Sequence, residues 1–310
     1  MHEYVRSYRP PRARRRAAAM ALSKLSGDAQ GIILGQLCNT LEPRLAVYFS
    51  SACTELRALL TPAVRQQLRA DYEAAAALCV KMGMRSCKEL REATSLLKNR
   101  GLSADDLATL GTLGSVLPAL RVLTLRESSR SAGPDGVPRL AEGLGGGALP
   151  AMAYLELYRM HVGDAGASAL AAALDRGALP RLEALSLADS VIGDAALVAL
   201  APALRRLSAL EELFLFGNPL GDEGLAALLA PPPPADTLPP PAGGLTNLEY
   251  LDLAGTQVSD AGCAALVTAL DSGALPALVT LDLDGIPASA AAKDAVSEAL
   301  ANSTAAALRP

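Results

Sequence analysis

Four aspartates recur at a regular spacing in the C-terminal two thirds of the chain, and paired carboxylates are one means of acid–base catalysis. Asp164, Asp194, Asp222 and Asp260 each directly precede a run of small and apolar residues with helical spacing. A carboxylate at the start of a helix accepts hydrogen bonds from free backbone N–H groups and is favoured by the helix dipole. The four positions therefore indicate helix capping rather than catalysis.

Histidine and cysteine offer no better catalytic or metal site. His2 and His161 lie far apart, and neither has a cysteine or a second histidine at ligand spacing, so we expect no metal. No serine or cysteine nucleophile has a histidine that the sequence can place nearby, and the phosphate-loop pattern GxxxxGK[ST] is absent. We therefore expect a protein that is not an enzyme and needs no cofactor.

The cysteines and the apolar residues indicate where the protein works. The cysteines are odd in number and show no CxxC spacing, which favours buried thiols in a reducing compartment. No apolar run reaches the length of a membrane helix, so we expect an intracellular protein, cytoplasmic or nuclear, without a membrane partner. The five cysteines are Cys38, Cys53, Cys79, Cys87 and Cys263.

A nine-residue phrase recurs through the same two thirds of the chain, at intervals of 28 to 38 residues. Each copy is followed, after a short turn, by small and apolar residues at helical spacing. Six units of strand, turn and helix over residues 117–303 cannot bury their leucines singly, so they predict a stacked solenoid. The phrase starts as LPALRVLTL at Leu117 and returns at Leu149, Leu179, Leu207, Leu245 and Leu275.

This pattern resembles the leucine-rich repeats of the ribonuclease-inhibitor type, over about 190 residues. The resemblance implies an α/β solenoid, with parallel strands on the concave face and helices on the convex face, that binds another protein. The same type of repeat occurs in the Ran GTPase-activating protein, so regulation of a small GTPase is the alternative function. The chain ends in ANSTAAALRP, without the long acidic tail usual in that family.

The chain departs from this family at the position after each strand, which often carries Asn or Cys. We therefore expect no continuous ladder of side chains along the turns. The six residues at this position are Ser128, Met160, Ser190, Asn218, Thr256 and Ile286.

Side chains between the inward leucines should project onto the concave face, and all five aromatic residues after residue 117 fall there. Rings supply contact area and carboxylates supply register, so this face suits a basic protein partner. The alternative is that the rings only cover the sheet. The predicted partner-binding residues are Tyr154, Glu156, Tyr158, Glu212, Phe214, Phe216, Tyr250, Asp252, Asp282 and Asp284.

The charge distribution supports a basic partner. Residues 1–100 hold 17 Lys and Arg against 8 Asp and Glu, whereas residues 101–310 hold 11 against 24. An acidic solenoid attracts a basic protein and speeds its encounter. Residues 1–27 begin with six arginines and one acid among the first 16, which predicts a disordered arm. The arm is a nuclear-import signal, an organellar transit peptide or a plain solvated tail, with at most non-specific nucleic-acid contacts.

Residues 28–86 should form small helices. Within them, Leu41, Pro43, Arg44, Cys53, Leu56 and Arg57 resemble an F-box, although the usual Leu-Pro opening is missing. This resemblance implies docking on the Skp adaptor of a cullin ubiquitin ligase through Leu41, Pro43, Arg44 and Leu56, while the repeats select the substrate. The alternative is a plain helical cap on the first edge of the solenoid.

Three further segments complete the organisation of the chain. Residues 61–82 and 86–99 should be helical, and residues 87–116 should form a degenerate capping repeat that ends in a helix. The Pro-rich insert 231–244 should be a stiff extended loop, either a tolerated insertion or a docking site for a proline-binding module. Residues 304–310 should form a tail.

Overall fold

The computed structural model describes residues 40–42, 61–99, 101–127, 131–230 and 244–307. The chain divides into two compact units, residues 1–77 and 78–310. Several predicted features lie outside the described residues, namely the arm 1–27, Cys38, Pro43, Arg44, Cys53, Leu56, Arg57, Ser128 and residues 231–243.

Little of the first unit is described beyond a turn at residues 40–42 and most of helix α5, Pro62–Lys81. Helix α5 confirms the helix predicted after residue 60. No helix within the described residues combines the length and apolar composition that a membrane span requires.

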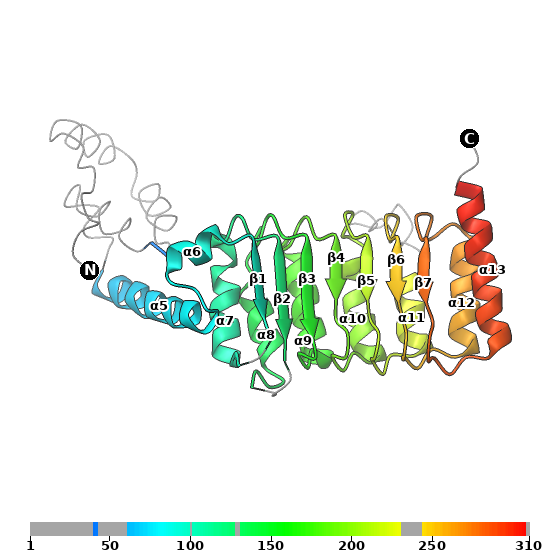
Figure 1. Ribbon diagram of the computed structural model, residues 1–310, viewed down its shortest axis with the longest axis horizontal. Helices are drawn as coiled ribbons and strands as arrows, with labels where there is room; N and C mark the ends of the chain where they lie inside the picture. Colours follow the sequence, from blue (N-terminus) through cyan, green and yellow to red (C-terminus); the bar gives the residue numbers. More distant parts are fainter. Residues whose placement is uncertain (1–39, 43–60, 100, 128–130, 231–243, 308–310) are drawn as a thin grey trace. The chain divides into compact units, whose positions relative to one another are not determined.

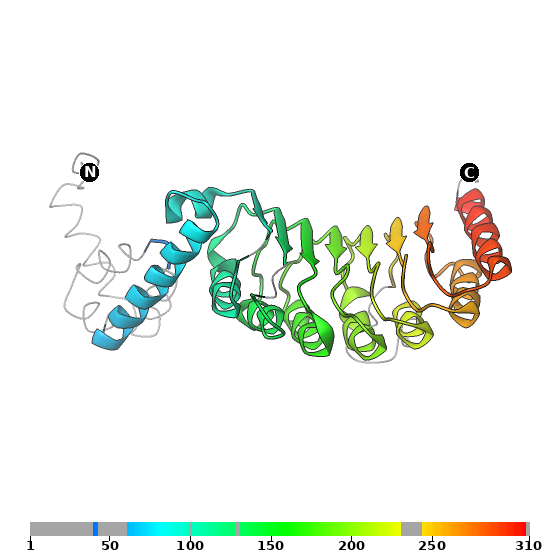
Figure 2. The ribbon, with the colours of Figure 1, turned by 60° about the horizontal axis from the view of Figure 1, so that its bottom comes forward.

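The second unit contains one parallel sheet of seven strands in chain order, and helices α7 to α12 pack along one face of this sheet (Figures 1 and 2). The strands are β1 Ser95–Lys98, β2 Val122–Arg126, β3 Tyr154–Tyr158, β4 Ala184–Ser186, β5 Glu212–Phe214, β6 Tyr250–Asp252 and β7 Thr280–Asp282. The helices are α6 Cys87–Glu92, α7 Ala104–Leu113, the 3-10 turn Gly114–Val116, α8 Gly136–Gly143, α9 Gly163–Asp175, α10 Asp194–Leu204, α11 Asp222–Leu229, α12 Asp260–Asp271 and α13 Ala290–Ala307. The predicted solenoid is confirmed.

Leucines from strands and helices form the core between the two layers. In the repeat of β4, Leu185 is 2% exposed, and Leu197 and Leu200 of α10 are fully buried. The central leucines of β2 to β7 stand in register from Leu123 to Leu281. Burying one such side chain contributes roughly 1.5–3 kcal/mol, so stacking supplies the stability that a single repeat lacks.

The helix predicted over residues 86–99 is wrong in its second half. Helix α6 ends at Glu92, and Ser95–Lys98 form β1, which pairs with β2 in parallel. Leu96 is 2% exposed whereas Leu97 is 61% exposed, so alternate side chains enter the core. Pairing with β2 therefore outweighs the helical spacing of the apolar residues, and the sheet has one strand more than the six predicted repeats.

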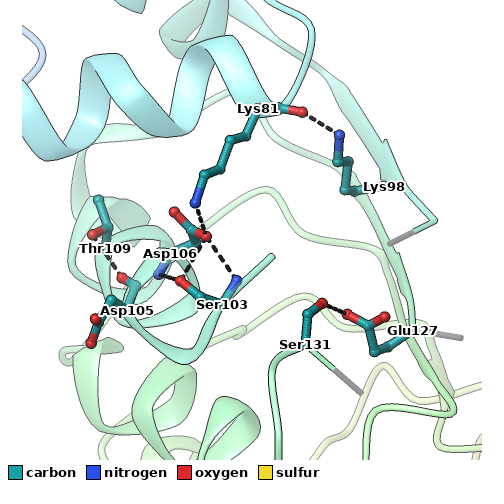
Figure 3. Close-up of polar contacts among 8 residues, drawn as sticks. All are labelled: Lys81, Lys98, Ser103, Asp105, Asp106, Thr109, Glu127 and Ser131. Atoms are coloured by element: carbon teal, nitrogen blue, oxygen red, sulfur yellow. Dashed lines mark hydrogen bonds and ion pairs between the residues drawn. The ribbon is translucent and has the colours of Figure 1, made fainter. Parts of the chain in front are cut away.

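A polar cluster fixes α7 at the start of the stack (Figure 3). Ser103 and Asp106 form a capping box, in which each side chain accepts a hydrogen bond from the backbone N–H of the other. The Asp106 carboxylate also lies 2.6 Å from Lys81 Nζ, and the Lys81 carbonyl accepts a hydrogen bond from Lys98. Burial alone would raise the pKa of Asp106, but these contacts with Lys81 and Ser103 lower it.

The described residues include three cysteines, Cys79, Cys87 and Cys263. All three belong to the second unit, and all three are free and buried. The sulfur atoms of Cys79 and Cys87 are 3.7 Å apart. Burial, together with the hydrogen bond to Cys87, raises the pKa of Cys79 to about 12, so this thiol stays protonated and unreactive at neutral pH. The prediction of buried thiols is confirmed for Cys79, Cys87 and Cys263.

Part of the turn ladder that we expected to be broken is present. Asn218 Oδ1 accepts hydrogen bonds from the N–H groups of Ser190 and Ile192, both at 2.9 Å. Ser190 Oγ in turn accepts from the Met160 N–H at 3.3 Å. Thr256 donates only within its own repeat, to the Leu253 carbonyl. Three consecutive turns are therefore linked, and the ladder stops after Asn218.

Three of the four aspartates that we predicted as caps of their own helices cap the next helix instead. Asp194 is the first residue of α10, one position too late to cap it, and its Oδ1 accepts from Gly221 and Gly224 N–H of α11 at 2.7 and 2.8 Å. Asp222 accepts in the same way from Ser259, the N-cap of α12, at 2.8 Å. Asp260 accepts from the Ser289 N–H before α13 at 2.6 Å. Each carboxylate thus joins two adjacent repeats.

Glycine at the third position of the next helix makes room for this carboxylate. A Cβ atom on Gly224 would lie 2.8 Å from Asp194 Oδ1, and one on Gly262 would lie 2.4 Å from Asp222 Oδ1. At these two junctions, the glycine therefore receives the carboxylate of the preceding repeat, and a larger side chain there would collide with it.

We predict that Asp222→Ala lowers the free energy of unfolding by about 1–2 kcal/mol, because the N-terminus of α12 loses its carboxylate cap. Urea denaturation followed by circular dichroism measures this. Asp164→Ala is the matched control, since Asp164 also lies in the first turn of a helix but makes no hydrogen bond through its side chain within the described residues. A control effect as large as that of Asp222→Ala would contradict the cap between repeats.

We also predict that this stabilisation depends on pH. Burial raises the pKa of Asp222, but the hydrogen bonds from Ser259 and Gly262 outweigh burial and lower it in the folded protein. The contribution of Asp222 is therefore complete above the ordinary aspartate pKa of about 3.9 and is lost as the pH falls through the lowered folded value. The difference in unfolding free energy between wild type and Asp222→Asn should be constant from pH 7 to pH 5 and shrink below pH 4. A difference that grows on acidification would refute this.

Candidate protein-binding face

Strand pairing places the predicted partner-binding residues on one face of the sheet. Tyr154, Glu212 and Tyr250 belong to one row of paired positions, which runs from Val122 on β2 to Thr280 on β7. A second row, two residues further along each strand, contains Glu156, Phe214, Asp252 and Asp282. The predicted alternation is therefore present in these two rows.

Small residues on β4 let the aromatic side chains of neighbouring strands approach each other. Ala184 and Ser186 of β4, and Ala188 shortly after it, are all buried. The rings of Tyr158 and Phe216, which come from either side of β4, have centroids 6.2 Å apart at 42°. The rings of Phe214 and Tyr250 lie 5.1 Å apart at 37°. All five predicted aromatics are half-buried, so they are held by contacts and still reach solvent.

At the β2 and β3 end of the face, charge is neutralised within the sheet. Arg126 donates to both oxygens of Glu156, at 2.7 and 3.3 Å, and the Tyr154 hydroxyl donates to Glu156 at 3.2 Å. Glu156 is 6% exposed. Burial and the neighbouring Glu156 charge raise the pKa of Tyr154 to about 12. Glu156 therefore serves as an internal anchor more than as a contact for a partner.

A second ion pair on this end involves two residues that we did not predict. Arg159 and Asp189 follow β3 and β4 with φ of 57° and 51°, at a position where the later repeats carry Gly217, Gly255 and Gly285. The Nε atom of Arg159 lies 3.3 Å from Asp189 Oδ2, and its guanidinium lies 5.0 Å from the centre of the Tyr158 ring. Aligning the repeats would have revealed both residues, because side chains there replace glycine in a left-handed conformation.

Asp189 and Arg126 complete the surroundings of Tyr158. The Tyr158 hydroxyl donates to the Asp189 carboxylate, and this hydrogen bond raises the pKa of Tyr158. Arg126 lies 5.9 Å from the centre of the same ring. Two guanidinium groups therefore lie within cation–π distance of the Tyr158 ring. The ion pairs of Arg126 with Glu156 and of Arg159 with Asp189 neutralise the carboxylates at this end of the face.

The β5 to β7 end of the face carries carboxylates without a cation. Glu212, Asp252, Asp282 and Asp284 form no ion pair with a lysine or arginine of the described chain. Asp252 is 8% exposed and stands directly opposite Asp282 in the sheet. Burial raises the pKa of Asp252 and outweighs the hydrogen bond from the Ala254 N–H, which lowers it, and the Asp282 charge raises it further. The face is therefore neutral at one end and acidic at the other.

A row of glutamates that we did not predict extends the acidic end. Glu183, Glu211 and Glu249 immediately precede β4, β5 and β6, and all are exposed. They are neighbours in space, because the Glu211 N–H donates to the Glu183 carbonyl and the Glu249 N–H donates to the Glu211 carbonyl, each at 2.7 Å. The Leu-Glu pair that recurs before β4, β5 and β6 was the available signal.

Residues 208–229 and 244–267 match the family described as Leucine Rich repeat, and these matches cover the units of β5 and β6. The chain carries leucine-rich repeats. The matched repeats contain Glu212, Phe214, Phe216, Tyr250 and Asp252 of the candidate face.

Among solved structures, the chain is similar to one titled Leiomodin-1 Actin-Binding Site 2 (ABS2), at 14% identity and a TM-score of 0.38. The similarity covers 58% of this chain and 91% of that chain. No curated protein matches the chain.

Leucine-rich repeats form protein-interaction scaffolds that are typically non-catalytic, and the face has the composition of such a scaffold. Across the described residues, no group of three or more His, Cys, Asp or Glu side chains is arranged to hold a metal ion. Of the residues predicted to bind an adaptor, only Leu41 is described, and it is 4% exposed.

Proposed function

We propose that this chain is a non-catalytic interaction module that holds a protein partner on the sheet face of its ribonuclease-inhibitor-type repeats. The observation that carries the proposal is the gathering of five half-buried aromatic side chains on one face by strands in register. Aromatic side chains dominate the binding energy of many protein interfaces, because each buries a large area.

Contacts between the rings support this proposal. The Phe214–Tyr250 and Tyr158–Phe216 contacts hold the rings before a partner arrives, so binding them loses little side-chain entropy. The unpaired carboxylates beside Phe214 and Tyr250 favour a basic partner and speed its approach.

We propose further that the F-box-like segment docks on a Skp adaptor, which would make the chain a substrate receptor of a cullin ubiquitin ligase. The support for this role is the sequence motif alone. The residues that would make this contact are Leu41, Pro43, Arg44 and Leu56, of which Leu41 is 4% exposed.

We predict that the triple variant Tyr154→Ala, Phe214→Ala and Tyr250→Ala binds its partner at least about 100-fold more weakly, since each ring is a candidate hot spot. Affinity capture from cell extract with quantitative mass spectrometry identifies the partner, and titration measures its affinity. Tyr72→Ala, which removes an aromatic that is 40% exposed on α5, is the control. If the triple variant keeps wild-type affinity and an unchanged circular dichroism spectrum, these three rings do not form the partner-binding site.

We predict that the full chain captures a Skp adaptor and a cullin, and that Arg44→Glu loses both because the substitution reverses a charge in the motif. Co-purification followed by mass spectrometry is the measurement, and Arg65→Glu on α5 is the matched control. If neither the wild type nor the control captures an adaptor, the ubiquitin-ligase role is wrong while the interaction module stands.

A further inference from the structure

A groove of about 380 Å³ lies between the last strand and the C-terminal helix. Tyr250, Asp282 and Asp284 line it from the sheet, and Lys293, Val296 and Leu300 line it from α13. Figure 2 shows α13 beside β7 at this end of the sheet. The groove continues the acidic end of the face, because Tyr250 belongs to both.

In each of two carboxylates beside the groove, those of Asp252 and Asp282, only one oxygen atom accepts a hydrogen bond. Asp252 Oδ1 accepts from the Ala254 N–H at 3.0 Å, and Asp282 Oδ1 accepts from the Asp284 N–H at 2.9 Å. The second oxygen of each has no hydrogen-bond partner within the described ranges. Like charges directly opposite each other on adjacent strands repel, so this pair is destabilising without a cation.

The cation in the groove wall does not relieve this repulsion. Lys293 Nζ donates to the Ile286 carbonyl at 3.2 Å, and no ion pair joins it to Asp282 or Asp284. The β2 and β3 end of the face differs, because Arg126 and Arg159 there neutralise Glu156 and Asp189. A binding site for an external cation is therefore expected only at the β5 to β7 end.

We propose that this groove and the adjoining Phe214–Tyr250 ring pair bind a short extended segment of the protein partner, with a lysine or arginine side chain placed between Asp252 and Asp282. The proposal rests on the proposed function and narrows it to one end of the face and one chemistry.

Charge complementarity and the apolar walls select this occupant. A lysine or arginine head satisfies both free carboxylate oxygens, and its aliphatic stem packs against a ring, where the cation also gains a cation–π attraction. The stem and an apolar neighbour can then cover Leu300 of α13, which is half-buried. Strands lie about 4.8 Å apart, so the distance from β5 to β7 is about 10 Å, which about three extended residues span before the segment enters the groove.

The test uses the full chain and a fluorescein-labelled peptide, Gly-Lys-Leu-Arg-Ala-Lys-Gly, with Gly-Gln-Leu-Gln-Ala-Gln-Gly as its uncharged counterpart. We expect the basic peptide alone to bind in fluorescence anisotropy. Asp252→Asn with Asp282→Asn should weaken binding roughly tenfold, because asparagine keeps the Oδ1 acceptor and removes the charge. The control Glu223→Gln with Asp271→Asn makes the same change in net charge at exposed positions on α11 and α12 and should alter affinity less than twofold.

Two peptide results overturn the inference, namely equal binding of both peptides to the wild type, or equal weakening by the site and control variants. Partner capture separates this inference from the proposed function. If the Asp252→Asn and Asp282→Asn variant captures the partner normally while the triple aromatic variant does not, the groove does not bind the partner's basic segment, whereas the aromatic face still binds the partner. If both variants capture normally, both are wrong.

Discussion

Burial of the leucines shared between neighbouring repeats is the constraint on which the rest of this structure depends. One repeat has too few leucines to exclude water, so each strand must pair with the next in a register that places the leucines of both in the core. That register also decides what the other face contains, because alternate side chains point outward. The aromatic and charged rows are therefore a by-product of the arrangement that buries the core.

Much of the fold could be predicted from the sequence, because a recurring phrase with leucines at alternate positions permits few arrangements. The register of β2 to β7 followed from that alternation. Strand β1 did not, because its apolar residues also fit a helix and only pairing with β2 decides between the two. The direction of the aspartate caps was equally hidden, since an aspartate at the first helical residue gives no sign that the next helix lies within its reach.

The residues of the candidate face could be predicted from the sequence, but the ion pairs between them could not. Sequence alternation identified both Glu156 and Asp252 as outward-facing carboxylates. Only the structure shows that Arg126 engages Glu156, while Asp252 faces another carboxylate. Pairing of this kind depends on which residues occupy adjacent strands and on how long side chains bend across them, and one repeat considered alone contains neither piece of information.

The aspartate contacts between repeats have a consequence for how the chain tolerates changes in length. Asp194 reaches Gly221 across 27 positions and Asp260 reaches Ser289 across 29, whereas Asp222 reaches Ser259 across 37, over the stretch that contains the Pro-rich residues. The same contact forms at all three junctions, so the geometry of a junction does not depend on the length of chain between its two halves. Closing a somewhat longer loop adds only a few tenths of a kcal/mol, since the entropy cost grows with the logarithm of length. The segment between α11 and β6 is thus the natural place to graft a reporter or an affinity tag without shifting the repeats on either side.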